Sequence, residues 1–363
     1  MSLAERKWFH LRGRMTDRVL VTGATGFIAQ HCMLQLLETG YEVRGTARST
    51  GRTSEVMAIL SPHLSVDARG RLDALDVVAA DLTRDDGWRD AVEGCRFVMH
   101  VASPLPRGVV KDENELIVPA RDGALRVLRA ARDAGVERVV LTSSLSAIVY
   151  GNDRSRLFTE SDWSNLEGER IGAYDKSKTI AEHAAWDYMG TIKDSSTMEM
   201  AVINPGLVMG PLLSNDWGTS GEMVKRILDH KVPAIPNINF ATVDVRDVAS
   251  AHVTAMMTPE AAGQRFICAE ANHSIMEIAR ILKANYGPRG FNVPTGRLPS
   301  IAIKTMAIFD KTVRLALNDL DTTQNVDNTK IRTVLNWQPR DLTEMTTSMA
   351  DSMIEYGVVR PKK

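Results

Sequence analysis

Tyr174 and Lys178 are the first residues whose types and spacing could do chemistry. They open the stretch AYDKSKTIAEHAAW, which begins at Ala173 and has the composition of a helix. Residues four apart lie on one face of a helix, so the two side chains point the same way, as does Glu182 one turn further on. A phenol with an ordinary pKa of about 10 is a poor acid or base at neutral pH, and a cation beside it favours its ionised form. The pair is therefore either a proton donor with its activating cation or two surface side chains on a shared face.

A glycine-rich turn near the start of the chain suits a dinucleotide. The turn TGATGFIA follows a short β-branched run and opens an apolar helix. Gly23 permits a tight turn, Gly26 lets the backbone approach a pyrophosphate, and the small Ala29 lets the helix pack on the strand. The start of the helix offers free N–H groups and partial positive charge to phosphates. We predict a dinucleotide site here, the plainer alternative being an ordinary turn between a strand and a helix.

The end of the second predicted strand indicates which dinucleotide binds. An NAD site places an acid there, about 20 residues past the glycines, to bind the ribose hydroxyls. This strand ends RGTARSTGR, with no carboxylate at its tip, and Arg48 and Arg52 offer guanidinium groups suited to a phosphate. We therefore predict NADP(H), the alternative being two solvated surface arginines. Asp81 and Leu82, after the third strand, are placed to meet the adenine end.

Strands and helices alternate through the part of the chain that carries these motifs. Helices are predicted after the glycine turn, from Asn114 to Ala134 and from Tyr174 to Met189, with short apolar strands between them. This alternation predicts an α/β fold, a doubly wound parallel sheet of the Rossmann type with right-handed crossovers. Later, the strand-like run FATVDVRDVA leads into a helix at 249–257, which Asp247 is expected to cap.

Prolines loosen the alternation after Pro205. We predict that residues 15–203 form the NADP-binding Rossmann domain, to which 241–270 return. Residues 204–363 are expected to form mainly a smaller, irregular substrate lobe over the carboxyl edge of the sheet, where open α/β sheets bind ligands. Residues 1–14 are interpreted as an N-terminal extension.

Composition excludes several other classes of protein. The 363 residues are 44% hydrophobic and 25% charged with a net charge of −1, which is typical of a soluble globular protein and argues against nucleic acid or an anionic membrane as partner. Cys32, Cys95 and Cys268 lack metal-ligand spacing and indicate buried thiols in a reducing compartment. No apolar run approaches the ~18 residues of a membrane helix, and the first residues lack a secretory signal. We predict a cytoplasmic monomer or homodimer without a metal site, acting on a small carbonyl or alcohol substrate.

Taken in order, the motifs resemble those of the extended short-chain dehydrogenases/reductases, from about Met15 to about Tyr356. Within them the chain is similar to the dihydroflavonol reductase and cinnamoyl-CoA reductase group, and most similar to its microbial NADPH-dependent aldehyde/ketone reductases. The resemblance rests on the order and spacing of eight motifs: TGATGFIA, ADL ending at Leu82, HVASP from His100, LTSS ending at Ser144, YDKSK from Tyr174, NPGLVMGP from Asn204, VDVRDVA from Val243 and a late LNWQPR.

The resemblance implies a role for each matching residue. Ser144 would hydrogen-bond the substrate carbonyl and Tyr174 would donate the proton, while Lys178 would hold the nicotinamide ribose and lower the pKa of the tyrosine. Arg48 would bind the 2′-phosphate. The full set of implied cofactor-binding residues is Gly23, Thr25, Gly26, Phe27, Ile28, Arg48, Arg52, Asp81, Leu82, Val101, Ala102, Ser103, Tyr174, Lys178, Pro205, Leu207 and Val208. From the residues alone, Ser144 has a plainer alternative as a strand-end hydroxyl that caps backbone.

The implied activity is the reversible, NADPH-dependent reduction of an aldehyde or ketone to an alcohol. Dihydroflavonol reductases carry an asparagine where Val149 stands, and GAYDKSK lacks the NWYCYGK motif of cinnamoyl-CoA reductases. Both departures favour the microbial branch. The alternatives are a hydroxysteroid-type dehydrogenase or a sugar-nucleotide epimerase on the same scaffold and, from another class, a non-catalytic NADP(H)-sensing protein.

A bulky or aromatic substrate is predicted from apolar residues near the later motifs. They would form a wall over the nicotinamide, with core packing of the small lobe as the alternative. The predicted wall is Leu105, Val149, Met209, Leu212, Leu213 and Trp217.

Overall fold

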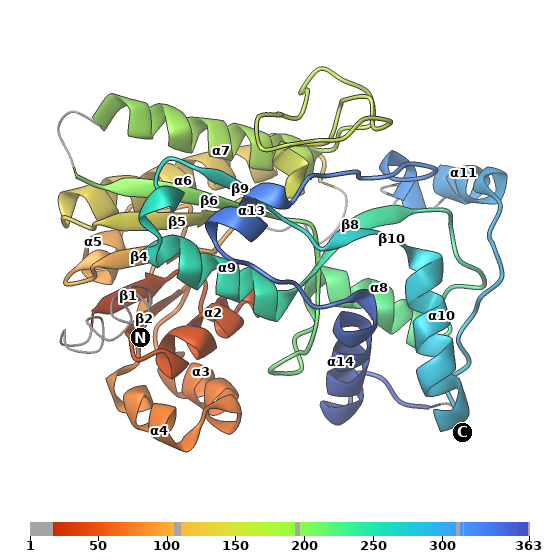
Figure 1. The fold of residues 1–363 in the computed structure, drawn as a ribbon, viewed down its shortest axis with the longest axis horizontal. Helices are drawn as coiled ribbons and strands as arrows, with labels where there is room; N and C mark the ends of the chain where they lie inside the picture. The colour runs from red at the N-terminus through yellow and green to blue at the C-terminus, as the bar shows by residue number, and fades with distance from the viewer. Residues whose placement is uncertain (1–16, 105–109, 193–196, 310–312, 315, 362–363) are drawn as a thin grey trace.

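A seven-stranded parallel sheet forms the larger part of the computed structural model, which describes residues 17–104, 110–192, 197–309, 313–314 and 316–361 (Figure 1). Neighbouring strands are all parallel. In spatial order they are β3 (Asp76–Ala79), β2 (Glu42–Ala47), β1 (Arg18–Val21), β4 (Phe97–His100), β5 (Arg138–Thr142), β6 (Glu199–Pro205) and β9 (Arg265–Cys268). The order turns back beside β1, which creates a crevice at the carboxyl ends of β1 and β4.

Helices cover both faces of this sheet (Figure 1). One face carries α2 (Phe27–Glu38) and α9 (Val245–Met257), and the other carries α5 (Trp88–Val92), α6 (Asn114–Asp133) and α7 (Ala173–Ile192). Fully buried Cys32 and Leu36 lie one turn apart on α2 and belong to the same apolar cluster as β1 and α9 residues. The helix ends where Gly40 takes a left-handed backbone conformation, with φ of 96°. Between β2 and β3 lie α3 (Thr53–Leu60) and α4 (Val66–Arg69).

A smaller lobe is built on a second, three-stranded sheet. Its strands are β10 (Ala271–Ser274), β8 (Asn239–Asp244) and β7 (Leu207–Met209), with β8 in the middle, antiparallel to β10 and parallel to β7. The remaining helices are α8 (Gly218–Leu228), α10 (Ile275–Tyr286), α11 (Ser300–Phe309), α13 (Thr329–Val334) and α14 (Leu342–Glu355). Short 3₁₀ turns are η1 (Ser61–His63), η2 (Gly70–Ala74), η3 (Leu145–Ala147), η4 (Pro259–Ala261), η5 (Gly287–Arg289) and η6 (Ala316–Asn318). Within the described ranges, every helix is too short or too polar to cross a bilayer.

The predicted Rossmann architecture is confirmed, and two details differ from the sequence-based expectation. The helix after FATVDV begins at Val245, because the Asp244 carboxylate accepts the Arg246 N–H (2.8 Å) and caps it. Asp247 is therefore not the cap; it lies in the first turn and bonds Arg340. The prediction that Asp247 caps this helix was wrong, because the cap lies about one turn earlier, at Asp244.

The two structural units also interleave more than the predicted boundaries allow. Within the returning segment 241–270, β9 is a strand of the large sheet and α9 packs against that sheet. Strand β8, in contrast, belongs to the small sheet. Near the C-terminus, Ile331, Leu335 and Trp337 pack back into the large core. The Trp337 indole N–H donates to the Asp247 carbonyl (2.9 Å), so the end of the chain ties the lobe to α9.

Candidate active site

The glycine turn after β1 has the geometry that a bound pyrophosphate requires. Gly23 has φ of 73°, and a Cβ there would lie 3.1 Å from the Cβ of Ala102. Its N–H donates to the Thr46 hydroxyl (3.1 Å), which fixes the turn against β2. Exposed Gly26 precedes the first turn of α2, and no side chain of the described residues caps that helix end. Phe27 and Ile28 begin the helix half-buried, and the N–H groups of this uncapped first turn are available to a phosphate, so the turn fits a dinucleotide.

Arg48 and Arg52 follow β2 but differ in their partners. Arg52 pairs with Glu55 on α3 (2.7 Å), so its guanidinium is engaged. Arg48 is exposed at the strand end. Two hydrogen bonds from Thr83, assisted by the charge of Arg48, lower the pKa of Asp81. Of the two arginines, Arg48 is the one whose charge acts on Asp81, and the roles of all three residues in cofactor binding stay predictions.

The turn after β4 is held by a buried polar pair. Thr22 Oγ1 accepts the Ala102 N–H (2.9 Å) and lies 2.9 Å from His100 Nδ1. Burial lowers the pKa of His100 to about 3, so its ring is neutral in this pair. Val101, Ala102 and Ser103, all half-buried, are thereby placed beside the glycine turn.

Ser144 lies directly past the carboxyl end of β5. Its extended backbone (φ −166°) begins η3, and its hydroxyl accepts the Ser146 N–H (3.1 Å). The same hydroxyl hydrogen-bonds Tyr174. The Ser144 side chain therefore does both things: it caps the backbone of η3, as considered from the sequence, and it contacts Tyr174.

Tyr174 is half-buried in the first turn of α7, and Lys178 Nζ lies 6.0 Å from the centroid of its ring. Burial raises the pKa of Tyr174 to about 12, the charge of Asp175 adds to the rise, and the hydrogen bond with Ser144 opposes it. The phenol is therefore protonated at neutral pH, which is the form that donates a proton. A lowering of its pKa by Lys178 stays a prediction.

Lys178 is buried over the end of β5, where its ammonium donates to the Thr142 carbonyl oxygen (3.5 Å). Burial lowers the pKa of Lys178 to about 8, and the negative charge of Glu182 opposes the fall. Thr142 is itself anchored, since its hydroxyl lies 2.7 Å from Nε2 of buried His252. The ammonium form predominates at neutral pH and gives way to the amine as the pH rises through about 8.

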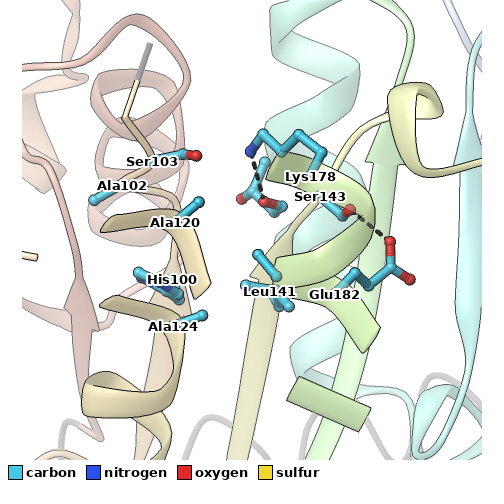
Figure 2. A pocket seen from close by; sticks show the side chains of 11 residues that line it. His100, Ala102, Ser103, Ala120, Ala124, Leu141, Ser143, Lys178 and Glu182 are labelled. Atoms are coloured by element: carbon cyan, nitrogen blue, oxygen red, sulfur yellow. Dashed lines mark hydrogen bonds between the residues drawn. The ribbon is translucent and has the colours of Figure 1, made fainter. Parts of the chain in front are cut away.

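A pocket lies between these two groups of residues. Figure 2 shows Lys178, Ser143 and Glu182 on one side of it and Ala102 and Ser103 on the other, with small α6 residues beside them. Its lining is His100, Ala102, Ser103, Ala120, Ala124, Leu141, Thr142, Ser143, Lys178, Ala181 and Glu182. Of the described residues, several polar groups and the Lys178 ammonium converge here on a narrow space beside the glycine turn.

Three further predicted residues lie on the side of the small lobe. Pro205 ends β6, and Leu207 and Val208 begin β7, so all three lie at the junction of the two sheets. Leu82, on the opposite side of the crevice, packs against Gly123 of α6. Their roles in cofactor binding stay predictions.

The predicted apolar wall is divided between separate clusters. Val149 is buried with Leu145 and Phe158, Leu213 lies in the core of the large sheet, and Met209 and Leu212 lie in the core of the small lobe. Half-buried Trp217 bonds Glu222 (2.9 Å) at the edge of that lobe. Leu105 lies outside the described residues. The structure does not gather these side chains around one described pocket, and their shared role in substrate binding stays a prediction.

Sequence reasoning missed a buried polar cluster behind the pocket. Glu182 and Asn204 are both 0% exposed, and Asn204 Nδ2 donates to Glu182 (2.8 Å) and to the Ser144 carbonyl (3.2 Å). The available signal was the spacing of Glu182, one turn after Lys178 on the same face of the helix. Its partners come from distant strands, which no local pattern connects.

A turn that fits a dinucleotide, beside a tyrosine, a lysine and a serine at the carboxyl edge of a parallel sheet, defines the class of nucleotide-dependent short-chain enzymes. Residues 19–269 match the model of the NAD dependent epimerase/dehydratase family. The chain belongs to this family.

Particular relatives cover nearly the whole chain. The NADPH-dependent methylglyoxal reductase GRE2 of Saccharomyces cerevisiae is 31% identical over 361 residues, which cover 93% of this chain and 98% of the relative. Cinnamoyl-CoA reductase CAD2 of Medicago truncatula is 35% identical over 281 residues, covering 74% of this chain and 80% of the relative. These names agree with the predicted group of reductases.

Solved structures give the same result. The yeast methylglyoxal/isovaleraldehyde reductase Gre2 complexed with NADPH matches with a TM-score of 0.77 at 29% identity, over 94% of this chain and 99% of that one. Gre2 of Candida albicans in complex with NADPH matches with a TM-score of 0.76 at 27% identity, over 94% and 99%. The comparisons confirm the predicted fold, the family and the prediction of an NADP(H)-dependent carbonyl reductase.

Proposed function

We propose that this protein reduces an aldehyde or ketone to the alcohol with NADPH, and that a bulky or aromatic carbonyl compound is its substrate. The observation that carries the proposal is the meeting of Ser144 with Tyr174 over the β5 end, with Lys178 one turn along the same helix. The relatives named for methylglyoxal, isovaleraldehyde and cinnamoyl-CoA reduction support the carbonyl class.

NADPH, when bound, supplies the hydride. The α2 end and the turn at Gly23 would hold its pyrophosphate, and Arg48 its 2′-phosphate. Ser144 and Tyr174 would both hydrogen-bond the carbonyl oxygen, which orients the substrate and stabilises negative charge as it develops. Tyr174 Oη then gives its proton to that oxygen. Lys178 stabilises the resulting phenolate through its charge and binds the cofactor ribose.

The test is consumption of NADPH, compared with NADH, with a panel of carbonyl compounds. The panel contains methylglyoxal, isovaleraldehyde, aromatic aldehydes, aromatic ketoesters and cinnamoyl-CoA. We expect turnover with NADPH and highest kcat/KM for a bulky or aromatic aldehyde or ketone. Tight NADPH binding without turnover of any compound would contradict the proposal and favour a sensor.

We further propose that the enzyme works in the cytoplasm as a monomer or homodimer. Cys32, Cys95 and Cys268 are all buried and free, as expected for a chain made in a reducing compartment. Light scattering after size-exclusion chromatography distinguishes a monomer or dimer from larger assemblies.

A further inference from the structure

Behind the Tyr174–Lys178 pair, α7 carries a carboxylate that solvent does not reach. Glu182 follows Lys178 by one turn and is 0% exposed. Burying a carboxylate costs several kcal/mol unless it is paired and hydrogen-bonded, so its surroundings need an account. The polar groups of the catalytic pair do not supply one, because neither side chain bonds it.

Four donors converge on this carboxylate. Oε2 accepts from Ser143 Oγ (2.5 Å) and Asn204 Nδ2 (2.8 Å), and Oε1 accepts from Arg265 Nε (2.5 Å) and Trp186 Nε1 (3.3 Å). An ionised carboxylate has about four acceptor sites and no proton to place, so the set is matched. Glu182 thus ties α7 to the ends of β5 and β6 and to β9 at once.

One of these ties reaches a residue proposed to touch the substrate. The Asn204 amide that donates to Glu182 also donates to the Ser144 carbonyl oxygen (3.2 Å). Ser143, held by the same oxygen of Glu182, is the residue before Ser144 (Figure 2). The Ser144 backbone is therefore fixed relative to the helix that carries Tyr174, through a single carboxylate oxygen.

The second consequence is electrostatic. Among the residues that the structure describes, Tyr174 and Glu182 on α7 and the Thr142 carbonyl and Ser143 at the end of β5 face Lys178. His100 and Ser103, from β4 and its turn, and Ala120 and Ala124, from α6, line the same pocket. Burial keeps His100 neutral, since its pKa is lowered to about 3, and Tyr174 is protonated at neutral pH. Among these groups Glu182 supplies the negative charge that opposes the loss of the Lys178 proton. The Arg265 cation lies on the far side of Glu182 and pairs with it.

We propose that Glu182 is a positioning residue for carbonyl reduction, which fixes Ser144 against Tyr174 through Ser143 and Asn204 and keeps the Lys178 ammonium charged in its buried place. This inference rests on the proposed function of Ser144, Tyr174 and Lys178. It adds a residue that touches neither substrate nor cofactor.

Glu182→Gln separates this role from simple filling of space. Arg265 and Trp186 can only donate, so the new amide oxygen must face them and its NH₂ must face Ser143 and Asn204. Asn204 can accept only by turning its Oδ1, which has no hydrogen-bond partner in the described part of the chain, toward position 182. That turn removes the donor from the Ser144 carbonyl, and the charge beside Lys178 is lost as well.

The experiment measures kcat and KM for NADPH-dependent reduction across pH for wild type, Glu182→Gln and Glu182→Asp. We expect Glu182→Gln to lower kcat about 10- to 100-fold, as for a displacement of about 1 Å at a reacting group. KM should change little, and the high-pH fall in kcat should move to lower pH, because Lys178 loses its proton more readily. Glu182→Asp keeps the charge, so its high-pH fall should stay at the wild-type position while kcat is reduced. A wild-type kcat and pH profile in Glu182→Gln would overturn the proposal.

Asn204→Ala keeps the test decisive if Glu182→Gln does not fold. It cuts the tie to Ser144 but leaves the charge, so kcat should fall about 10-fold without a shift of the profile. Wild-type kcat in Asn204→Ala would overturn the positional role.

A matched control is Asp247→Asn. Asp247 lies on α9, away from the pocket, and is likewise a buried carboxylate that pairs with an arginine. The substitution should lower the melting temperature and leave the pH profile in place; a shift of its profile equal to that of Glu182→Gln would overturn the local role of Glu182. Failure of the proposed function is separately visible, since wild type would then be inactive on every compound or Tyr174→Phe would stay active.

Discussion

At the carboxyl edge of the seven-stranded sheet, residues that the sequence singled out from separate motifs lie close together: Ala102 and Ser103 after β4 line one pocket with Lys178 on α7. Gly23 of the glycine turn packs against Ala102, and Ser144 after β5 meets Tyr174 on α7. The described residues singled out for a substrate wall are instead divided between the core of the large sheet, the core and edge of the small lobe, and the cluster that holds Val149. The difference lies in what fixes each set. Strand ends of a parallel sheet converge by topology, whereas a pocket wall depends on how distant segments pack.

Loss of the proposed proton donor should give the largest effect on kcat. It tests the residues gathered at the carboxyl edge of the large sheet. Tyr174→Phe is expected to lower kcat by about 10²- to 10⁴-fold, because in the described part of the chain Tyr174 is the acid that meets Ser144, while NADPH affinity stays close to wild type. Steady-state kinetics and fluorescence titration with NADPH measure the two quantities.

The control for this change is Tyr188→Phe, the same substitution about four turns further along α7, where Arg132 lies over the ring (5.9 Å). It should leave kcat unchanged. Retained activity in Tyr174→Phe would remove the acid assignment.

Met209 tests the predicted substrate wall, whose residues are divided between clusters. Its side chain is 0% exposed in the core of the small lobe. Met209→Ala should lower the free energy of unfolding by about 2–5 kcal/mol, since a cavity replaces a fully packed side chain. The ratio of rates across the carbonyl panel should not change. Urea unfolding and the panel assay give the two readouts.

Half-buried Trp217 is the matched partner, because its ring lies at the edge of the same lobe. Trp217→Ala should change the ratio of rates for bulky over small carbonyl compounds. If instead Met209→Ala alters that ratio at unchanged stability, Met209 lines the substrate site and its assignment to the core is wrong.

Cofactor choice should give a smaller effect, at the adenine end of the crevice. Arg48→Asp should lower kcat/KM for NADPH relative to NADH by about 10- to 100-fold, since charged hydrogen bonds contribute about 1.5–3 kcal/mol and the new acid repels the phosphate. Arg52→Asp is the control with a weaker expected shift, because Arg52 already pairs with Glu55. An equal shift in both variants would assign the phosphate to the pair and not to Arg48.

Local patterns were sufficient for the elements that carry the site. The predicted helix 114–134 is α6 to within one residue, and the predicted helix 174–189 is the inner part of α7. The strand β9 was not predicted; it joins the sheet by pairing with β6, a long-range contact that no local pattern reveals. Glu182 could be placed on the face of Lys178, but its partners Asn204 and Arg265 lie 22 and 83 residues away in the chain. Sequence spacing thus identified the candidate catalytic residues, whereas the contacts that hold them in place depend on tertiary packing.

The most direct test of the account is a crystal structure with NADPH and a slowly reduced carbonyl analogue. We expect the Tyr174 and Ser144 hydroxyl oxygens each to lie about 2.6–3.2 Å from the carbonyl oxygen, with the carbonyl carbon facing the nicotinamide ring. A Tyr174 hydroxyl remote from the nicotinamide, or a carbonyl oxygen bound by other groups, would contradict the central claim that this phenol is the proton donor.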